Sequence, residues 1–145
     1  MLLNKIPIMN IKNITVAGIA GGIILLITMF VFGKIAGFLA PFDMTTLGGM
    51  RAMNDPVMSL FFFYPFVIAF AAAILFDIIK DSLKGNVLYK GIVFGLLLFM
   101  LETIPSMVVI FTTMTYPLGF FISAFLNGII AYPVIGILFV KIWKM

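Results

Sequence analysis

Long apolar runs separated by short polar or charged segments dominate the chain. Residues 14–33 and residues 56–76 contain no charged side chain, and residues 91–140 contain only Glu102. A helix needs about 20 predominantly apolar residues to cross a bilayer, so the third run is long enough for two crossings. The break between them falls at Pro117, because proline suits the first turn of a new helix and disfavours helical geometry in the residue before it.

This pattern predicts an all-α integral membrane protein in which one domain, residues 1–145, forms a bundle of four transmembrane helices. The expected spans are residues 14–36, 57–80, 88–111 and 117–140. We expect the first span to be retained, because its apolar run is longer than the roughly 7–15 residues of a signal-peptide core. The longest connection, residues 37–55, is expected to hold a short amphipathic helix that Asp43 caps on the outer membrane surface.

Composition narrows the function classes. Hydrophobic residues make up 64% of the chain and charged residues 10%, whereas a soluble domain is roughly half apolar and about a quarter charged. The chain has no cysteine and no histidine, which removes thiol chemistry and the commonest general base and metal ligand. It also lacks a phosphate-binding loop and a nucleophile elbow. We therefore expect no enzyme activity, no cofactor and no metal.

The basic residues indicate an orientation and not a nucleic-acid surface, because they lie at the ends of the apolar runs. One side of the membrane would hold Lys34 and Arg51. The other side would hold the remaining seven: Lys5, Lys12, Lys80, Lys84, Lys90, Lys141 and Lys144. Since positive residues stay in the cytoplasm, both termini are expected to be cytoplasmic, in a protein of the cell membrane.

Small residues mark the expected packing faces. Lipid gives helices no hydrophobic reward for associating, so close backbone approach at small residues must hold them together. Two glycine stripes with spacings near whole helical turns are expected to be such faces: Gly18, Gly22, Gly33 and Gly37 in the first span, and Gly91 and Gly95 in the third. In the second span, Ala69 and Ala73 are in line with Asp77.

Glu102 is the residue most relevant to function. It lies about eleven residues inside an apolar run, roughly 15 Å from either surface, where a charge costs at least about 2.5–3.5 kcal/mol. Burial favours the neutral acid, and we expect it to bond Asn127, at matched depth on the next helix, with Ser106 as a second candidate. Ser123 shares the face of Asn127. Glu102 is either a tether between two helices or a carboxylate that handles a proton or a cation.

Two prolines interrupt the third and fourth spans. Pro105 lies three residues after Glu102, and Pro133 occupies the middle of the fourth span. Each removes an N–H and leaves the carbonyl four residues earlier without its usual partner. We expect a tolerated kink at each position, with a freed carbonyl near the carboxylate.

Charged residues outside the apolar runs have two interpretations. In the outer loop, Asp43, Arg51 and Asp55 could bind a polar headgroup, the arginine taking its phosphate. The alternative, which we favour, is that the aspartates cap helices and Arg51 is solvated or paired. At the far end of the second span, Asp77 and Lys80 are expected to be solvated.

The sequence alone favours a small multi-pass membrane protein that acts as a non-catalytic accessory, assembly or binding module. Its expected partners are the lipid bilayer and either a second copy of itself or another membrane protein. The alternative is a small oligomeric transporter or channel subunit that uses Glu102 for proton or cation coupling. An enzyme is the weakest of the three.

Overall fold

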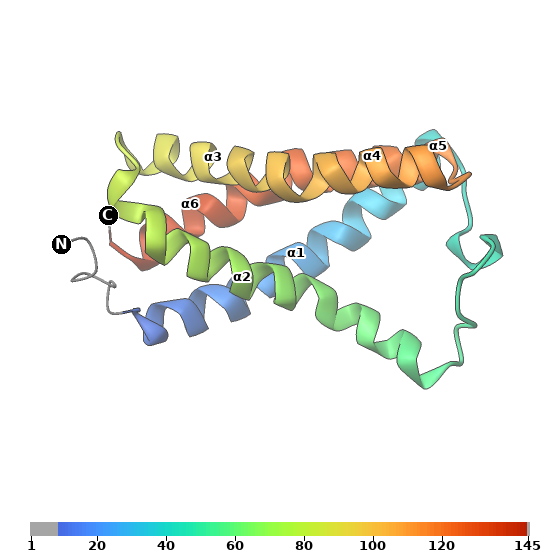
Figure 1. Ribbon diagram of the computed structural model, residues 1–145, viewed down its shortest axis with the longest axis horizontal. Helices are drawn as coiled ribbons and strands as arrows, with labels where there is room; N and C mark the ends of the chain where they lie inside the picture. The colour runs from blue at the N-terminus through green and yellow to red at the C-terminus, as the bar shows by residue number, and fades with distance from the viewer. Residues whose placement is uncertain (1–8, 145) are drawn as a thin grey trace.

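The computed structural model describes residues 9–144 and contains four long helical rods (Figure 1). Each rod is long and apolar enough to cross a membrane: Ile11–Leu39, Pro56–Ser82, Val87–Thr113 and Leu118–Ile142. The prediction of an all-helical protein with four such spans is therefore confirmed. The observed helices extend the expected spans by a few residues at most ends, because they begin at capping residues that lie outside the apolar runs.

The first two rods begin at polar caps. Helix α1, Ile11–Leu39, starts where the side chain of Asn10 accepts a hydrogen bond from the backbone N–H of Asn13. The second rod joins a 3₁₀ segment, η2 (Pro56–Phe63), to helix α2 (Tyr64–Ile79) and a final 3₁₀ turn, η3 (Lys80–Ser82). Asp55 caps η2 by accepting from the N–H of Val57 at 2.8 Å, and Pro56 occupies the first helical turn.

The third and fourth rods each contain one π-helical turn. The third consists of α3 (Val87–Leu98), the π turn η4 (Phe99–Thr103) and α4 (Ile104–Thr113). The fourth consists of α5 (Leu118–Leu126), the π turn η5 (Asn127–Ala131) and α6 (Tyr132–Ile142). Each π turn ends two residues before a proline, Pro105 or Pro133. A proline ring collides with the carbonyl four residues earlier in an α-helix, and a wider turn makes room for it.

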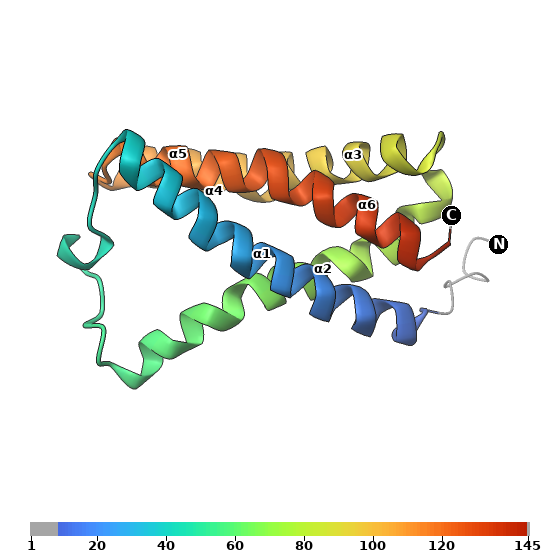
Figure 2. The same ribbon diagram turned by 180° about the vertical axis from the view of Figure 1, so that it is seen from behind.

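The start of the second rod diverges from the other rods at one end of the molecule, whereas the end of α1 stays beside α5 there (Figures 1 and 2). We call the end with residues 9 and 144 and the turn 83–86 the closed end, and the end with the connections 40–55 and 114–117 the open end. Helix α3 packs along α6, and α1 packs along α2 and also touches α5 and α6. Helix α2 crosses α1, so that η2 diverges from α4 and α5 at the open end.

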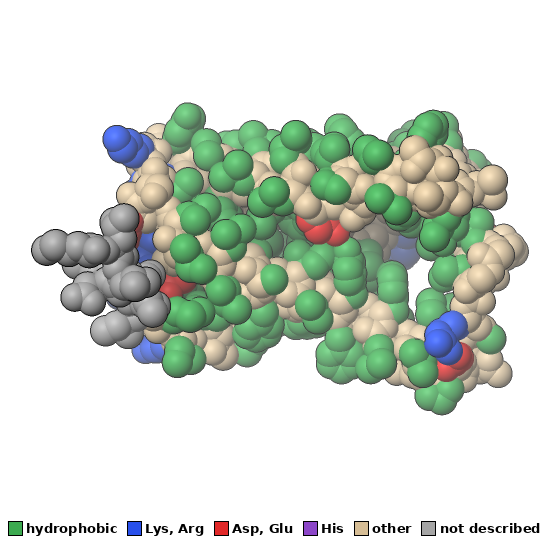
Figure 3. Space-filling view, viewed as in Figure 1, with side chains coloured by type: hydrophobic (Ala, Val, Ile, Leu, Met, Phe, Trp, Pro, Cys, Tyr) green, Lys and Arg blue, Asp and Glu red, His purple; other side chains and the backbone are tan. Residues whose placement is uncertain are grey.

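Interlocking small and large side chains fill the closed end. Phe76, Phe94 and Phe139 are fully buried, and the ring of Phe76 lies 5.0 Å from that of Phe94 and 5.8 Å from that of Phe139. Gly91 and Gly95 lie so close to the backbone of α6 that an added Cβ would collide with it. The exterior is covered with large apolar side chains, as Figure 3 shows for one face.

The expected glycine stripe of α1 divides into two parts. Gly18 lies against the ring of Phe70 and Gly22 against that of Phe66, where α1 crosses α2. A Cβ at Gly33 would meet only Ser123 Oγ, at 3.9 Å, and a Cβ at Gly37 would meet nothing within 4 Å. Among the described residues, the stripe therefore packs tightly against another helix at Gly18 and Gly22 but not at Gly33 and Gly37.

The connection 40–55 holds a single 3₁₀ turn, η1 (Met44–Thr46), where a short amphipathic helix was expected. The carboxylate of Asp43 accepts hydrogen bonds from the N–H and the hydroxyl of Thr45, at 2.8 and 2.6 Å, so it is the cap that the sequence predicted. The first residues of the connection lie over Gly119, whose missing side chain leaves room for Ala40 and Phe42. This contact fixes the start of the connection to α5.

Candidate functional site

Glu102 lies in the π turn η4 and joins three of the four rods. Its Oε1 accepts a hydrogen bond from the hydroxyl of Tyr64 in α2 at 2.7 Å. Its Oε2 accepts from the hydroxyl of Tyr132 in α6 at 2.5 Å and from that of Thr103 at 2.9 Å. Three hydroxyl donors thus converge on one carboxyl group.

The predicted bond between Glu102 and Asn127 is wrong, because Tyr132 bonds Glu102 instead. Side chains on a helix lean toward its N-terminus, so the long ring of Tyr132 reaches back to the depth of Asn127. The Oδ1 atom of Asn127 is buried and has no hydrogen-bond partner within residues 9–144. Ser106, the second candidate, makes no bond with Glu102 among the described residues.

The residues predicted for the polar site nevertheless line one cavity: Glu102, Ser106, Ser123 and Asn127. It has a volume of about 430 Å³ and lies toward the open end, between η2 and the first residues of α2 on one side and α1, α4 and α5 on the other. Figure 3 shows a hollow between the rods in this part of the molecule. Most of its lining is apolar, with polar groups from these residues: Tyr64, Glu102, Thr103, Ser106, Ser123, Asn127 and Tyr132.

Aromatic and flexible apolar side chains form the cavity walls. Phe30, Phe42, Phe61 and Phe120 line it, as do Met29 and Met107. Pockets for small ligands usually have volumes of about 300–1,000 Å³, apolar walls and a few placed polar groups. This cavity has the size and lining of such a pocket.

A second hollow reaches Glu102 from the side of the molecule. It has a volume of about 360 Å³ and lies between α2 and the third rod, with Ala71, Leu75 and Leu101 among its lining residues. Glu102 and Ser106 line both hollows. The carboxyl group therefore lies between the cavity and a lateral groove.

The arrangement around Glu102 can accept hydrogen bonds or bind a cation. Hydroxyl donors stabilise an ionised carboxylate, because bonds to a charged acceptor are shorter and stronger than neutral ones. Within residues 9–144, the two ion pairs are Arg51–Asp55 at 2.9 Å and Lys80–Asp77 at 2.7 Å. No described lysine or arginine therefore lies within ion-pair distance of Glu102.

The three outer-loop residues do not form one binding site. Arg51 pairs with Asp55, whereas Asp43 bonds Thr45. The hydrogen bonds from Thr45 lower the pKa of Asp43. The pKa of Asp55 is lowered by the hydrogen bond from Arg51 and by a second one from the backbone N–H of Val57. This geometry matches the interpretation in which both aspartates are caps. The loop contributes to the cavity through Phe42 and Met44.

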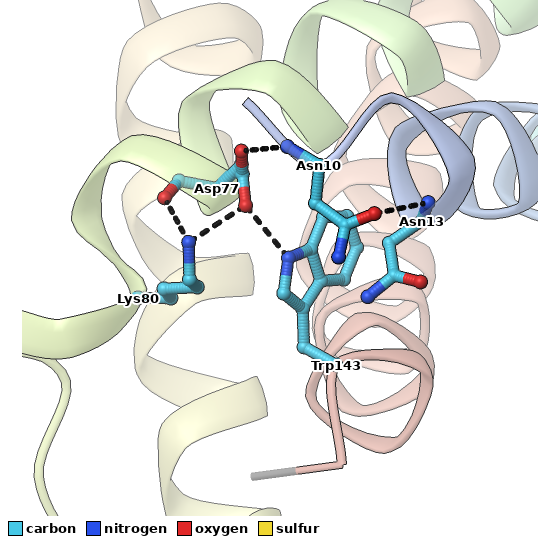
Figure 4. Close-up of polar contacts among 5 residues, drawn as sticks. All are labelled: Asn10, Asn13, Asp77, Lys80 and Trp143. Atoms are coloured by element: carbon cyan, nitrogen blue, oxygen red, sulfur yellow. Dashed lines mark hydrogen bonds and ion pairs between the residues drawn. The ribbon is translucent and has the colours of Figure 1, made fainter. Parts of the chain in front are cut away.

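Asp77 is not solvated, as had been expected, but is 2% exposed at the closed end. Its Oδ1 accepts from the indole N–H of Trp143 and the ammonium of Lys80, both at 2.7 Å. Its Oδ2 accepts from the backbone N–H of Asn10 at 2.9 Å. Figure 4 shows these four residues, which we call the clasp. The clasp ties both ends of the described chain to α2.

Sequence reasoning missed the tyrosines, although a signal was present. Both Tyr64 and Tyr132 precede a proline inside an apolar run. A phenol at that depth needs a hydrogen-bond partner, and Glu102 was the one acid available in the third run.

Comparison of the chain with protein-family models, curated proteins and solved structures found no match.

Proposed function

We propose that this protein is a non-catalytic binding module of the membrane, which holds a small amphipathic molecule in the cavity around Glu102. The observation that carries the proposal is the cavity itself. Its walls are apolar, and three of its polar groups, the hydroxyls of Tyr64, Thr103 and Tyr132, bond one carboxyl group. A ligand with one polar end and an apolar body would match both parts.

We also propose how the chain is oriented in the membrane. The seven-to-two distribution of basic residues supports cytoplasmic termini in the cell membrane, with the open end facing outward. The connection 40–55, with the turn Met44–Thr46, would then lie at the outer surface beside the cavity. Single cysteines at Ser82 and Gly48 would be tested in intact cells with an impermeant thiol reagent. Labelling of Gly48→Cys alone is expected, and labelling of Ser82→Cys alone would reverse the orientation.

A cavity-filling variant tests the binding function. Ala124 lines the cavity, so Ala124→Phe would occupy part of it. Val108 is 56% exposed on α4, outside the lining, and Val108→Phe is the matched control. The probes are 4-phenylbutylamine and 4-phenylbutanol, measured by equilibrium dialysis against the protein in maltoside micelles and against empty micelles. We expect excess binding to the wild type and to Val108→Phe, and its loss in Ala124→Phe. The proposal fails if neither probe binds in excess.

Transport is the second candidate, favoured by the position of Glu102 between two hollows. A carboxylate accessible from both could exchange a proton between them. One four-helix chain has little room for a water-filled path, so transport requires a dimer or a larger assembly. Proton uptake into proteoliposomes that Glu102→Gln abolishes, together with a dimer in mild detergent, would move transport to first place.

A further inference from the structure

The chemical class of the ligand can be inferred from the groups that face the cavity. This inference rests on the proposed binding function and deepens it. Three features bear on the class: the hydrogen bonds of Glu102, the free acceptor of Asn127 and the aromatic walls.

The hydrogen bonds of Glu102 match an ionised carboxylate. Each of the three surrounding hydroxyls donates its single hydrogen to a carboxyl oxygen, at 2.5 to 2.9 Å. An ionised carboxylate accepts all three of these bonds, whereas a neutral carboxyl would have to donate one of them to a hydroxyl oxygen. Hydroxyls alone leave the negative charge unbalanced in an apolar cavity, and no described Lys or Arg pairs with it. A cation would balance it.

Asn127 lines the same cavity, and its Oδ1 atom is a second acceptor. Among the described residues this buried atom has no hydrogen-bond partner, which is unfavourable for a polar atom away from water. An alcohol has one hydrogen to donate, which serves only one of the two acceptors. A protonated amine has several N–H groups and a positive charge, so it could serve Asn127 and Glu102 together.

The cavity walls suit the rest of such a molecule. Rings of Phe30, Phe42, Phe61 and Phe120 line the cavity beside Tyr64 and Tyr132. Aromatic faces attract cations within about 6 Å of the ring centre and also pack against apolar groups. We infer that the cavity binds an amphipathic organic amine in its cationic form. Its nitrogen bonds Glu102 and Asn127, and its apolar part lies among the aromatic rings.

A matched set of three probes tests the inference. 4-Phenylbutylamine, 4-phenylbutanol and 4-phenylbutyrate share one apolar part and carry a positive, neutral and negative end at pH 7. Their dissociation constants would be measured by calorimetry on the full chain in an uncharged maltoside detergent. For the wild type, we expect the amine to bind at least tenfold more tightly than the alcohol, and the acid to bind most weakly.

Variants locate the site of the preference. Glu102→Gln should bind the amine and the alcohol about equally, and Asn127→Leu should weaken the amine several-fold more than the alcohol. Asp81→Asn, which removes an exposed acid at the closed end, should keep the wild-type ratio. If Glu102→Gln does not fold, Tyr64→Phe replaces it as the test variant, because it removes one hydrogen-bond donor to Glu102. It should reduce the preference for the amine over the alcohol.

The outcomes separate the inference from the proposed function. Equal binding of the amine and the alcohol by the wild type overturns the inference and leaves the binding function intact. A preference for the amine that survives in Glu102→Gln also overturns it, because the nitrogen then binds elsewhere. If none of the three probes binds in excess over empty micelles, the proposed function fails as well.

Discussion

The two ends of the same four rods are built differently. At the closed end, α3 buries Gly91, Phe94, Gly95 and Leu98, and aromatic rings interlock across three rods. At the open end, neither α4 nor η2 contains a buried residue. The closed end is a packed core, and the open end surrounds a cavity.

The difference follows from where small residues occur. Membrane helices approach closely only where side chains are small, because lipid is as apolar as leucine. Gly91, Gly95 and Gly136 allow this along α3 and α6, and Ala69 and Ala73 allow it on α2. The start of the second rod has three consecutive phenylalanines instead, at 61–63. The small residues of the closed end and the large residues of η2 therefore explain why the second rod packs at one end and diverges at the other.

The largest expected effect comes from filling the contact between α3 and α6. A side chain at Gly95 would collide with the backbone of Pro133, which cannot move without bending α6. We expect Gly95→Leu to cost more than the roughly 1–3 kcal/mol of ordinary overpacking and to leave little folded protein. Size-exclusion chromatography and thermal unfolding in detergent measure this. A monodisperse variant with the wild-type melting temperature would show that the closed end is not tightly packed.

Removal of Asp77 should come next. Asp77→Ala leaves the indole N–H of Trp143 and the backbone N–H of Asn10 without their acceptor, and leaves Lys80 without its anion. Breaking a buried ion pair by removing one partner costs about 3–5 kcal/mol, and the partial exposure of Lys80 places this change near the lower figure. Chemical unfolding should show the loss, with a change in Trp143 fluorescence. The control Asp81→Ala, one turn further on, should change neither.

Substitution of Glu102 should have a smaller effect on stability, because the open end is less packed. Glu102→Leu removes the acceptor of three hydroxyls and should cost about 1–2 kcal/mol. Glu102→Gln keeps the shape but replaces one acceptor oxygen by a donor NH₂ group, so it should cost less than Glu102→Leu in thermal unfolding. Infrared titration of the carboxyl band in the wild type would report the charge state. A protonated band at pH 7 supports the neutral tether expected from the sequence and opposes the cation inference.

The smallest effect is expected at Gly37, in the open half of α1. A side chain there meets nothing within 4 Å, so Gly37→Leu should change the unfolding free energy by no more than about 0.5 kcal/mol. Gly22→Leu is the contrasting variant, since it would collide with Phe66. Marked destabilisation or dissociation in Gly37→Leu would indicate that this half of the stripe packs against another chain.

The sequence predicted the regular features of this molecule well. Long apolar runs located the four rods, and Asp43 and Asp55 cap the 3₁₀ segments that begin after them. The depth of Glu102 identified the residue around which polar groups gather. These features depend on local composition, which can be read along a single chain.

The contacts between rods were harder to predict. The faces of the third and fourth spans that carry Glu102 and Asn127 were predicted for straight α-helices, but a π turn adds one residue and rotates the rest of the helix by about 100°. Glu102 therefore meets Tyr132 and not Asn127. Asp77 was misread because charge at a span end is usually solvated, although its alignment with Ala69 and Ala73 marked an inward face. Such errors arise wherever a tertiary contact overrides a local rule.

The connection 40–55 has a mechanical consequence for the cavity. Its start is held against α5, so residues 43–55 form a tether from that fixed point to Pro56 at the tip of η2. Fully extended, such a segment could reach roughly 45 Å, at about 3.3–3.6 Å per residue. The entropic cost of loop closure grows only slowly with length. Insertions or deletions in this tether would therefore change the largest distance that the tip of η2 can reach from α5. They would do so at little cost in stability and without changing any side chain in the rods.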